Sequence, residues 1–237
     1  MNKYKSEQNT SYTLGITLTI ELLMQMPEMV KCIYFHNDFE DGIGKKRIED
    51  LCKSFDIPII VNNKIFNVLS NKENCYCIGE FIKFHKELTN GNHIVLVNPS
   101  DAGNLGTIER SALGFGFNNI AVIKPCVDHF NPKAVRASMG ALFHLNIKVY
   151  ETFENYYNEF SNHSMFPFML KAKENLGNIK SLNKEQPISL IFGNEAKGLP
   201  DEFLKIGTPI IINHSSSIDS LNLPIACSIA MYEASKK

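Results

Sequence analysis

Short apolar runs and longer amphipathic segments alternate along this chain from its first residues. In the first 84 residues, apolar positions spaced three and four apart predict helices, and continuous apolar runs predict strands. The expected helices cover 13–26, 45–55 and 65–70, and the expected strands cover 30–35, 57–61 and 75–84. This order predicts a small α/β unit, and the polar stretch 85–93 is the best candidate for a linker after it.

The alternation restarts after that stretch and continues to the end of the chain. Strands are expected at 94–97, 120–123, 147–150, 165–171, 188–192 and 209–212. Helices are expected at 104–116, 133–143, 154–160 and 223–236. Strands that alternate with helices in this way predict an α/β fold with a mostly parallel sheet covered on both faces. We therefore expect two domains, residues 1–88 and residues 93–237.

The composition narrows the class of protein. With 44% hydrophobic and 21% charged residues among 237, it matches an ordinary soluble globular protein. No apolar run approaches the roughly 20 residues that cross a membrane, and the polar N-terminus lacks the apolar core of a signal peptide. We therefore expect a cytoplasmic protein that does not insert into a membrane.

Cysteine spacing and net charge exclude two further classes. The six cysteines form no CxxC pair and no paired Cys/His spacing, which indicates reduced thiols and no structural zinc site. The formal net charge of -1 argues against a protein that coats nucleic acid non-specifically. It leaves room for a local basic face on a balanced body.

Candidate chemistry lies in three loops, each at the end of a predicted strand. They cover 98–110, 192–199 and 212–223, and each carries glycine or small polar residues that let a ligand approach the backbone. In α/β proteins the carboxyl ends of strands are where ligands bind. The chain has no GxGxxG and no P-loop, so dinucleotide and nucleoside-triphosphate binding have no motif support.

Taken singly, each loop also has an ordinary structural interpretation. Arg110 can be a solvent-exposed arginine of a helix, and Gly193 and Gly198 can simply punctuate a turn. Ser220 can be a plain N-cap of the last helix, which is the commonest role of such a serine.

Taken together and in this order, the loops resemble the motifs of the SpoU (TrmH-like) family of RNA ribose methyltransferases, in the SPOUT class. The family's Asn-x-Gly-x-x-x-Arg core reads here as 104–110, and Phe-Gly-x-Glu-x-x-Gly-Leu is matched in full by 192–199. The third motif, Ser-Leu-Asn-Val-Ser-x-Ala with a later Tyr-Glu, reads as 220–226 and 232–233. Segment 131–143 is also similar to family sequence. The resemblance covers 94–237, and the first 85 or so residues resemble the family's RNA substrate-binding N-terminal domain.

The chain departs from the family pattern in two places. The family usually has Ile-Pro-Met-x-Gly before the third motif, where this chain has Ile-Asn-His-Ser-Ser at 212–216. Pro224 stands where a serine is usual, which costs little because the first N–H groups of a helix are unpaired. Neither departure removes a residue expected to be catalytic.

The resemblance implies the reaction and its cofactor. It implies transfer of a methyl group from S-adenosylmethionine to a ribose 2′-hydroxyl of ribosomal or transfer RNA, without a metal. It also implies a C-terminal trefoil knot, which periodicity alone would not suggest because knots are very rare, and a homodimer. Family members hold the cofactor with the backbone of the second and third motifs, which maps onto Phe192, Gly193, Ile212, Ser220 and Leu221.

The resemblance also implies the catalytic residues. Arg110 is the first-motif arginine, for which activation of the 2′-hydroxyl is proposed in the family. Because a guanidinium stays protonated, we favour a role in positioning the adjacent phosphate and stabilising alkoxide charge. Asn104, Glu195 and Asn222 are expected to hold the loops and to hydrogen-bond the ribose or Arg110.

RNA contacts are expected from Lys133, Arg136 and Lys197, and the cluster 45–47 is either a further RNA contact or the solvated start of a helix.

A second hypothesis for the function is an RNA-binding assembly factor that keeps the fold without turnover, although the retained motif residues count against it. A third, a nucleotide enzyme of ordinary Rossmann type, lacks the glycine fingerprint.

Overall fold

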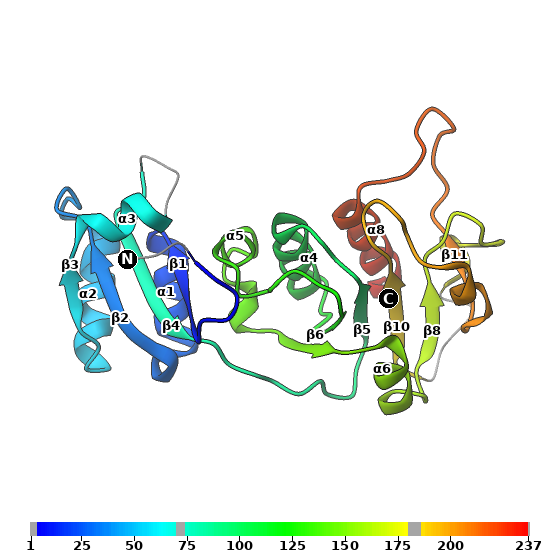
Figure 1. Cartoon of the computed structure of the whole chain (residues 1–237), viewed down its shortest axis with the longest axis horizontal. Coiled ribbons are helices and arrows are strands. Elements are labelled where there is room, and N and C mark those ends of the chain that lie inside the picture. Colours follow the sequence, from blue (N-terminus) through cyan, green and yellow to red (C-terminus); the bar gives the residue numbers. More distant parts are fainter. Residues whose placement is uncertain (1–3, 70–73, 180–185, 237) are drawn as a thin grey trace. The chain divides into compact units, whose positions relative to one another are not determined.

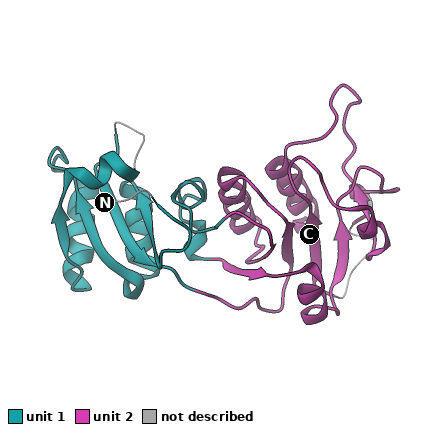
Figure 2. Cartoon of the chain, in the orientation of Figure 1, with its two compact units in different colours: residues 1–84, 128–144 teal, residues 85–127, 145–237 magenta. Residues whose placement is uncertain are grey.

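The computed structural model describes residues 4–69, 74–179 and 186–236, which form two compact units (Figure 2). The N-terminal unit comprises residues 1–84 and 128–144, and the C-terminal unit comprises 85–127 and 145–237. Their boundaries differ from the expected domains 1–88 and 93–237, because segment 128–144 groups with the N-terminal unit.

The N-terminal unit is built on a four-stranded sheet in the order β1-β4-β2-β3 (Figure 1). Its strands are β1 (Thr10–Leu14), β2 (Val30–Phe35), β3 (Ile59–Val61) and β4 (Cys77–Ile82). Its helices are α1 (Ile16–Gln25), η1 (Pro27–Met29), α2 (Ile43–Ser54) and α3 (Asn63–Leu69). Strand β4 runs antiparallel to β1 and β2, while β3 is parallel to β2. The small α/β unit expected from the pattern is confirmed, and residue 70 of one expected helix lies outside the described residues.

The expected helix at 13–26 is wrong at its start. Residues Thr10–Leu14 form β1, and α1 begins only at Ile16, after Gly15. Strand β1 pairs with β4, about 70 residues later in the chain, and the Thr13 hydroxyl accepts a hydrogen bond from Gly79 N at 3.0 Å. Local periodicity does not report a pairing with so distant a partner.

Segment 128–144 contains α5 (Pro132–Ala137) and η2 (Ala141–Phe143) instead of one continuous helix. Gly140 separates them in a left-handed conformation, with φ 94°, which ends a helix and which glycine adopts without strain. Three contacts fix the segment to the N-terminal unit: Lys83 pairs with Asp128 at 2.8 Å, the Ser11 hydroxyl donates to the Phe130 carbonyl, and the Phe143 ring meets Phe81 edge-on.

The C-terminal unit contains a five-stranded sheet in the order β7-β6-β5-β10-β8, and every described pair in it is parallel. Its strands are β5 (His93–Val97), β6 (Asn119–Ile123), β7 (Asn146–Tyr150), β8 (Ser164–Pro167) and β10 (Ile188–Phe192). The parallel sheet predicted from the alternation is confirmed. The expected linker 85–93 is partly built into this unit, since Leu88 packs in its core.

The last expected strand, at 209–212, does not join that sheet. Strand β11 (Ile210–Ile211) pairs instead with β9 (Glu174–Asn175) in a separate two-stranded sheet. Strand β9 lies in a charged segment for which the sequence predicts no strand. Two short 3-10 helices, η3 (Leu176–Asn178) and η4 (Asp201–Lys205), complete this region.

Helices cover both faces of the five-stranded sheet, as the alternation predicts. Figure 1 shows α4 (Ala102–Gly114) and α8 (Leu223–Ser235) on one side of the strands and α6 (Phe153–Glu159) on the other. Val95, Ala121 and Ile191 face a cluster with Tyr156 and Phe160, around α6. Their neighbours along the same strands are also fully buried, which explains the continuous apolar runs. In the described part of the chain, no helix has the length and apolar character to span a membrane.

A chain of buried polar groups crosses the amino end of this sheet. His93 Nε2 lies 2.9 Å from the Thr89 carbonyl, which only accepts, so this nitrogen donates and Nδ1 accepts from the Tyr156 hydroxyl at 2.9 Å. Tyr156 then accepts from Ser189 at 2.6 Å, and Ser189 accepts from His163 Nδ1 at 2.9 Å. This order leaves His163 Nε2 as a bare acceptor, and it has no partner among the described residues. Burial lowers the pKa of both imidazoles, so both rings are neutral at pH 7, the state in which these donor and acceptor roles hold.

Acid should destabilise the C-terminal unit through these histidines. Burial, followed by the neighbouring His93 ring, lowers the pKa of His163 from its ordinary 6.5 to about 4, and burial also lowers that of His93. The unfolded chain binds more protons between these values, so the free energy of unfolding should fall by about 2 to 3 kcal/mol as the pH drops from 6.5 to 4. Urea denaturation across this range measures the loss.

The variant His163→Asn keeps a donor to Ser189 and removes the titrating ring, so it should flatten this pH dependence. The matched control is His85→Asn, which removes an imidazole exposed to solvent. An unchanged slope in His163→Asn would contradict the assignment.

Candidate active site

The first two candidate loops meet at one edge of the five-stranded sheet. Strand β5 ends at Val97 and strand β10 at Phe192, and these two strands are parallel neighbours. The loops that follow them therefore leave the sheet side by side, at its carboxyl edge. The third loop follows β11 and leads into α8.

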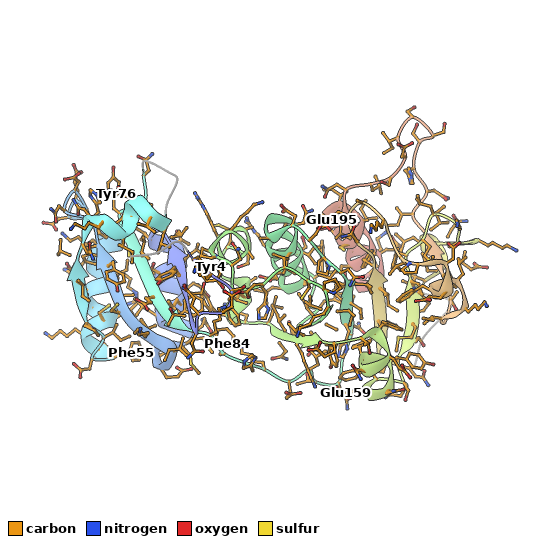
Figure 3. The ribbon with its side chains drawn as sticks, in the orientation of Figure 1. Tyr4, Phe55, Tyr76, Phe84, Glu159 and Glu195 are labelled. Atoms are coloured by element: carbon orange, nitrogen blue, oxygen red, sulfur yellow. The ribbon has the colours of Figure 1, made fainter. Side chains whose placement is uncertain are left out.

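One carboxylate, that of Glu195, binds the first loop to the second (labelled in Figure 3). Its Oε2 accepts hydrogen bonds from the Ser100 hydroxyl at 2.7 Å and from Ser100 N at 3.1 Å. Its Oε1 accepts from Asp101 N at 3.1 Å and from Asn104 Nδ2 at 3.3 Å. The structure thus brings together Asn104 and Glu195, two of the four residues predicted to be catalytic.

The protonation state of Glu195 follows from these donors. Burial alone would raise the pKa of its carboxyl, but the hydrogen bonds from Ser100 and Asp101 outweigh burial and lower the pKa below its ordinary value. Glu195 is therefore ionised at neutral pH and is a weak base. This favours its predicted role in holding the loops over a role in proton transfer.

Asn194 shapes the second loop and was not among the residues singled out from the sequence. Its Nδ2 donates to the Asn98 carbonyl at 2.9 Å, and its Oδ1 accepts from the backbone N of Ala196 and Lys197 at 3.0 and 3.2 Å. The loop folds back so closely that a Cβ on Gly193 would lie 2.1 Å from the carbonyl carbon of Gly198. The Asn-x-x-x-Gly spacing was the available signal, because asparagine side chains commonly bond their own turns.

A cavity of about 340 Å³ opens beside the second and third loops. All five residues predicted to hold the cofactor line it: Phe192, Gly193, Ile212, Ser220 and Leu221. Its size is that of a small-molecule site, and at Gly193 any side chain would collide with the Gly198 backbone, so bare backbone borders the cavity there. The residues present therefore fit a nucleoside cofactor, while the assignment itself stays a prediction.

Two further residues line this cavity beside the five predicted to hold the cofactor: Phe168, from a segment that the sequence did not assign to the site, and His214, from the third candidate loop. The Phe168 ring stacks on Phe192 with centroids 4.4 Å apart and an interplanar angle of 12°. His214, in the stretch that departs from the family pattern, donates from Nδ1 to the Ile212 carbonyl at 2.9 Å. Phe168 follows β8, whose carboxyl end lies at the same edge of the sheet as that of β10.

The remaining predicted catalytic residues are exposed. Arg110 lies on α4 directly after Glu109, whose carboxyl is completely buried with a raised pKa, so the helix turns Arg110 outward. Asn222 occupies the N-cap of α8, and its side chain makes no capping bond. The interpretation of Ser220 as that N-cap is therefore wrong. Neither Arg110 nor Asn222 bonds Glu195, and their catalytic roles stay predictions.

The three predicted RNA contacts lie on different elements. Lys133 and Arg136 are on α5, in the N-terminal unit, and Lys197 is exposed on the second loop of the C-terminal unit. Among the described residues, no group of three or more His, Cys, Asp or Glu side chains could hold a metal ion.

Comparison with known proteins identifies the family to which this chain belongs. The model of the SpoU rRNA methylase family matches residues 91–232. A tRNA/rRNA methyltransferase of Synechocystis sp., itself uncharacterized, is 28% identical over 61% of this chain and 53% of its own length. A 23S rRNA (uridine(2479)-2′-O)-methyltransferase of Streptomyces viridochromogenes is 30% identical over 60% of this chain and 51% of its own. The chain thus spans about half the length of these curated relatives.

A solved structure extends the similarity to both units. The AdoMet-bound rRNA methyltransferase of Sinorhizobium meliloti has a TM-score of 0.80 and 25% identity, and the match covers 95% of this chain and 87% of that one.

Glu195→Gln should loosen the two loops without unfolding the unit. The two carboxylate oxygens of Glu195 now accept hydrogen bonds from several donors, and an amide has only one oxygen that can accept them. The donors left without an acceptor should lower the free energy of unfolding by about 1–3 kcal/mol. Hydrogen exchange at the Ser100 and Asp101 amides should accelerate, because both donate to Glu195. The control Glu202→Gln changes an exposed carboxylate on η4 and should leave both amides protected. Protected amides in Glu195→Gln would contradict the role given to this residue.

Proposed function

Because the chain belongs to the SpoU rRNA methylase family, we propose that it transfers a methyl group from S-adenosylmethionine to a ribose 2′-hydroxyl of structured RNA. The observation that carries the proposal is the cavity beside the second and third loops, which all five residues predicted to hold the cofactor line. The 2′-O activity in the name of the Streptomyces relative and the AdoMet bound to the Sinorhizobium protein support it. The RNA is ribosomal or transfer RNA.

The reaction divides between the cofactor and the protein. S-adenosylmethionine, held by the loops that carry Phe192, Gly193, Ile212, Ser220 and Leu221, would supply an activated methyl group for the ribose 2′-oxygen. The 2′-hydroxyl is a weak nucleophile, so the protein must orient it and stabilise the charge that develops on its oxygen. Arg110 is exposed on α4 and makes no hydrogen bond or ion pair with the described residues, so its guanidinium is available to an RNA phosphate and to that oxygen.

We also propose a homodimer formed through α8. One face of this helix buries Cys227, Ala230 and Met231, while its other face exposes Ile225, Ile229 and Tyr232, by 52%, 37% and 54%. An exposed apolar stripe with this spacing is typical of a helix that packs against a partner. A second copy of the chain is the partner that the family resemblance implies.

The C-terminal trefoil knot and the cellular compartment are further proposals. Strand β11 pairs outside the main sheet, and the chain then returns to pack α8 beside β10 and α4. A segment that leaves the sheet and returns supports a threaded C-terminus. Cytoplasmic location, expected from the composition, stays a proposal. RNA binding by the N-terminal unit also stays a proposal, and so do the RNA contacts of Lys133, Arg136 and Lys197.

Arg110→Ala should abolish methyl transfer while cofactor binding survives. We expect the rate to fall about 100-fold or more, which is the usual cost of removing a group that stabilises developing charge. Tritiated methyl transfer to bulk RNA measures the rate, resistance of the product to alkaline cleavage identifies ribose methylation, and isothermal titration measures S-adenosylmethionine affinity. The control Lys205→Ala removes an exposed cation on η4 and should keep full activity.

Near-normal turnover in Arg110→Ala would overturn the motif assignment. RNA binding by the unaltered protein without any methyl transfer would instead favour an assembly factor that keeps the fold.

Ile229→Glu should convert the dimer into a monomer, because it places a charge in the centre of the apolar stripe. Light scattering coupled to size exclusion measures the mass, with Met24→Glu, an exposed apolar residue of α1, as the control. A dimer that persists in Ile229→Glu would mean that another surface holds the copies together.

A further inference from the structure

The carboxyl group of Glu109 is buried in the C-terminal unit, and the function proposed above gives it no role. Its side chain lies on α4, one residue before Arg110, and is 0% exposed to solvent. Neither of its oxygens has a hydrogen-bond partner among the described residues. Glutamate is almost never fully buried unless it is paired, so this side chain is a departure from the ordinary packing of a helix.

The burial of Glu109 comes from the chain itself. Leu105, Ile108 and Ala112 lie on the same side of α4 and are also fully buried. This helix packs against α8 and lies over the five-stranded sheet (Figure 1). Because a single copy of the chain already excludes solvent from Glu109, a partner molecule has no access to its carboxyl group.

The surroundings of Glu109 offer no charge that would stabilise its ionised form. On the elements packed against α4, the described titratable groups are those of α8 and of the strands beneath: Cys227, Tyr232, Glu233, Lys236 and His93. Cys227 is itself completely buried, with its pKa raised by burial. Glu233 pairs with Lys236, and His93 bonds the Thr89 carbonyl at the amino end of β5.

Glu109 is therefore an uncharged acid in the folded protein. Burial raises the pKa of its carboxyl well above the ordinary 4.5, with no opposing contribution from a neighbouring charge. An unpaired carboxylate at this position would cost far more free energy than its protonation.

Helix α4 is fixed on both sides of this residue. At its start, the Asp101 side chain accepts a hydrogen bond from Asn104 N at 2.8 Å. Farther along, the Ser228 hydroxyl of α8 donates to the Ser111 hydroxyl at 2.9 Å. Between these points the buried side of the helix is held by packing, and Glu109 supplies part of that packing directly beneath the turn that carries Arg110.

We propose that Glu109 is a positioning residue, which as a buried neutral acid fixes the turn of α4 that presents Arg110. The inference rests on the proposed function, because it gives Glu109 its role through Arg110. A smaller side chain, or a charge at this position, would let the turn move and carry the guanidinium away from its place.

The first test is the pH dependence of stability in Glu109→Gln, which keeps the size of the side chain and has no group to ionise. The unfolded chain loses the Glu109 proton near pH 4.5 and the folded protein keeps it, so rising pH should favour unfolding of the unaltered protein. From pH 5 to 8, its unfolding constant in urea should increase about tenfold or more relative to that of the variant.

The histidines cancel in this ratio, because both proteins carry them. Glu109→Leu gives the same comparison without a buried amide. A ratio that stays constant with pH in both variants would overturn the proposal.

The second test separates positioning from stability. Glu109→Ala removes the packing beneath Arg110 and should lower kcat about tenfold with little change in affinity for S-adenosylmethionine, while Glu109→Gln should restore kcat. In an Arg110→Ala background, Glu109→Ala should lower kcat no further, because Glu109 acts through Arg110. The control Thr107→Ala truncates an exposed residue of the same helix and should keep full activity.

An unaltered kcat in Glu109→Ala, or an equal loss in the two backgrounds, would contradict the positioning role. Failure of the unaltered protein to bind S-adenosylmethionine or to methylate RNA would instead overturn the proposed function. The unfolding ratio does not depend on activity, so the two failures are distinguishable.

Discussion

An ionised carboxylate binds two loops of the candidate active site to each other. Glu195 lies partly out of water, and that cost is offset because Ser100, Asp101, Asn104 and the neighbouring Asn194 donate to its two oxygens. These bonds join loops that are about 95 residues apart in the chain. Asn194 adds a bond to the Asn98 carbonyl, so Glu195 and Asn194 together hold the first loop against the second loop, which borders the proposed cofactor site.

The amino and carboxyl ends of the strands in the parallel sheet have different roles. At the amino edge, His93, Tyr156, Ser189 and His163 form a buried chain of hydrogen bonds whose direction is set by the Thr89 carbonyl. These groups stabilise the unit only while both imidazoles are neutral. At the carboxyl edge, loops replace packed side chains and leave polar groups exposed, among them Lys197. The buried groups that stabilise the unit and the loops of the candidate active site thus lie at opposite ends of the strands.

Helix α8 links the cofactor cavity to the proposed dimer. Leu223 at its first turn and Ala226 line the cavity, while Ile229 and Tyr232 form the exposed stripe farther along. Its buried face packs against α4, the helix that carries Asn104 and Arg110. A partner held on the outer face of α8 would therefore stiffen both the helix that borders the cofactor and the helix that presents the arginine.

Local sequence determined the alternation of strands and helices, the parallel sheet and the positions of the three loops, because burial on both faces leaves continuous apolar runs and turns require particular residues. Family motifs pointed to Asn104 and Glu195. Only the tertiary structure decided what depends on distant partners: the pairing of β1 with β4, the placement of 128–144 in the N-terminal unit, and the departure of β11 from the main sheet. It also decided that Glu195 bonds Ser100 and that Glu109 is sealed from solvent, since no periodicity along the chain records which segments meet in space.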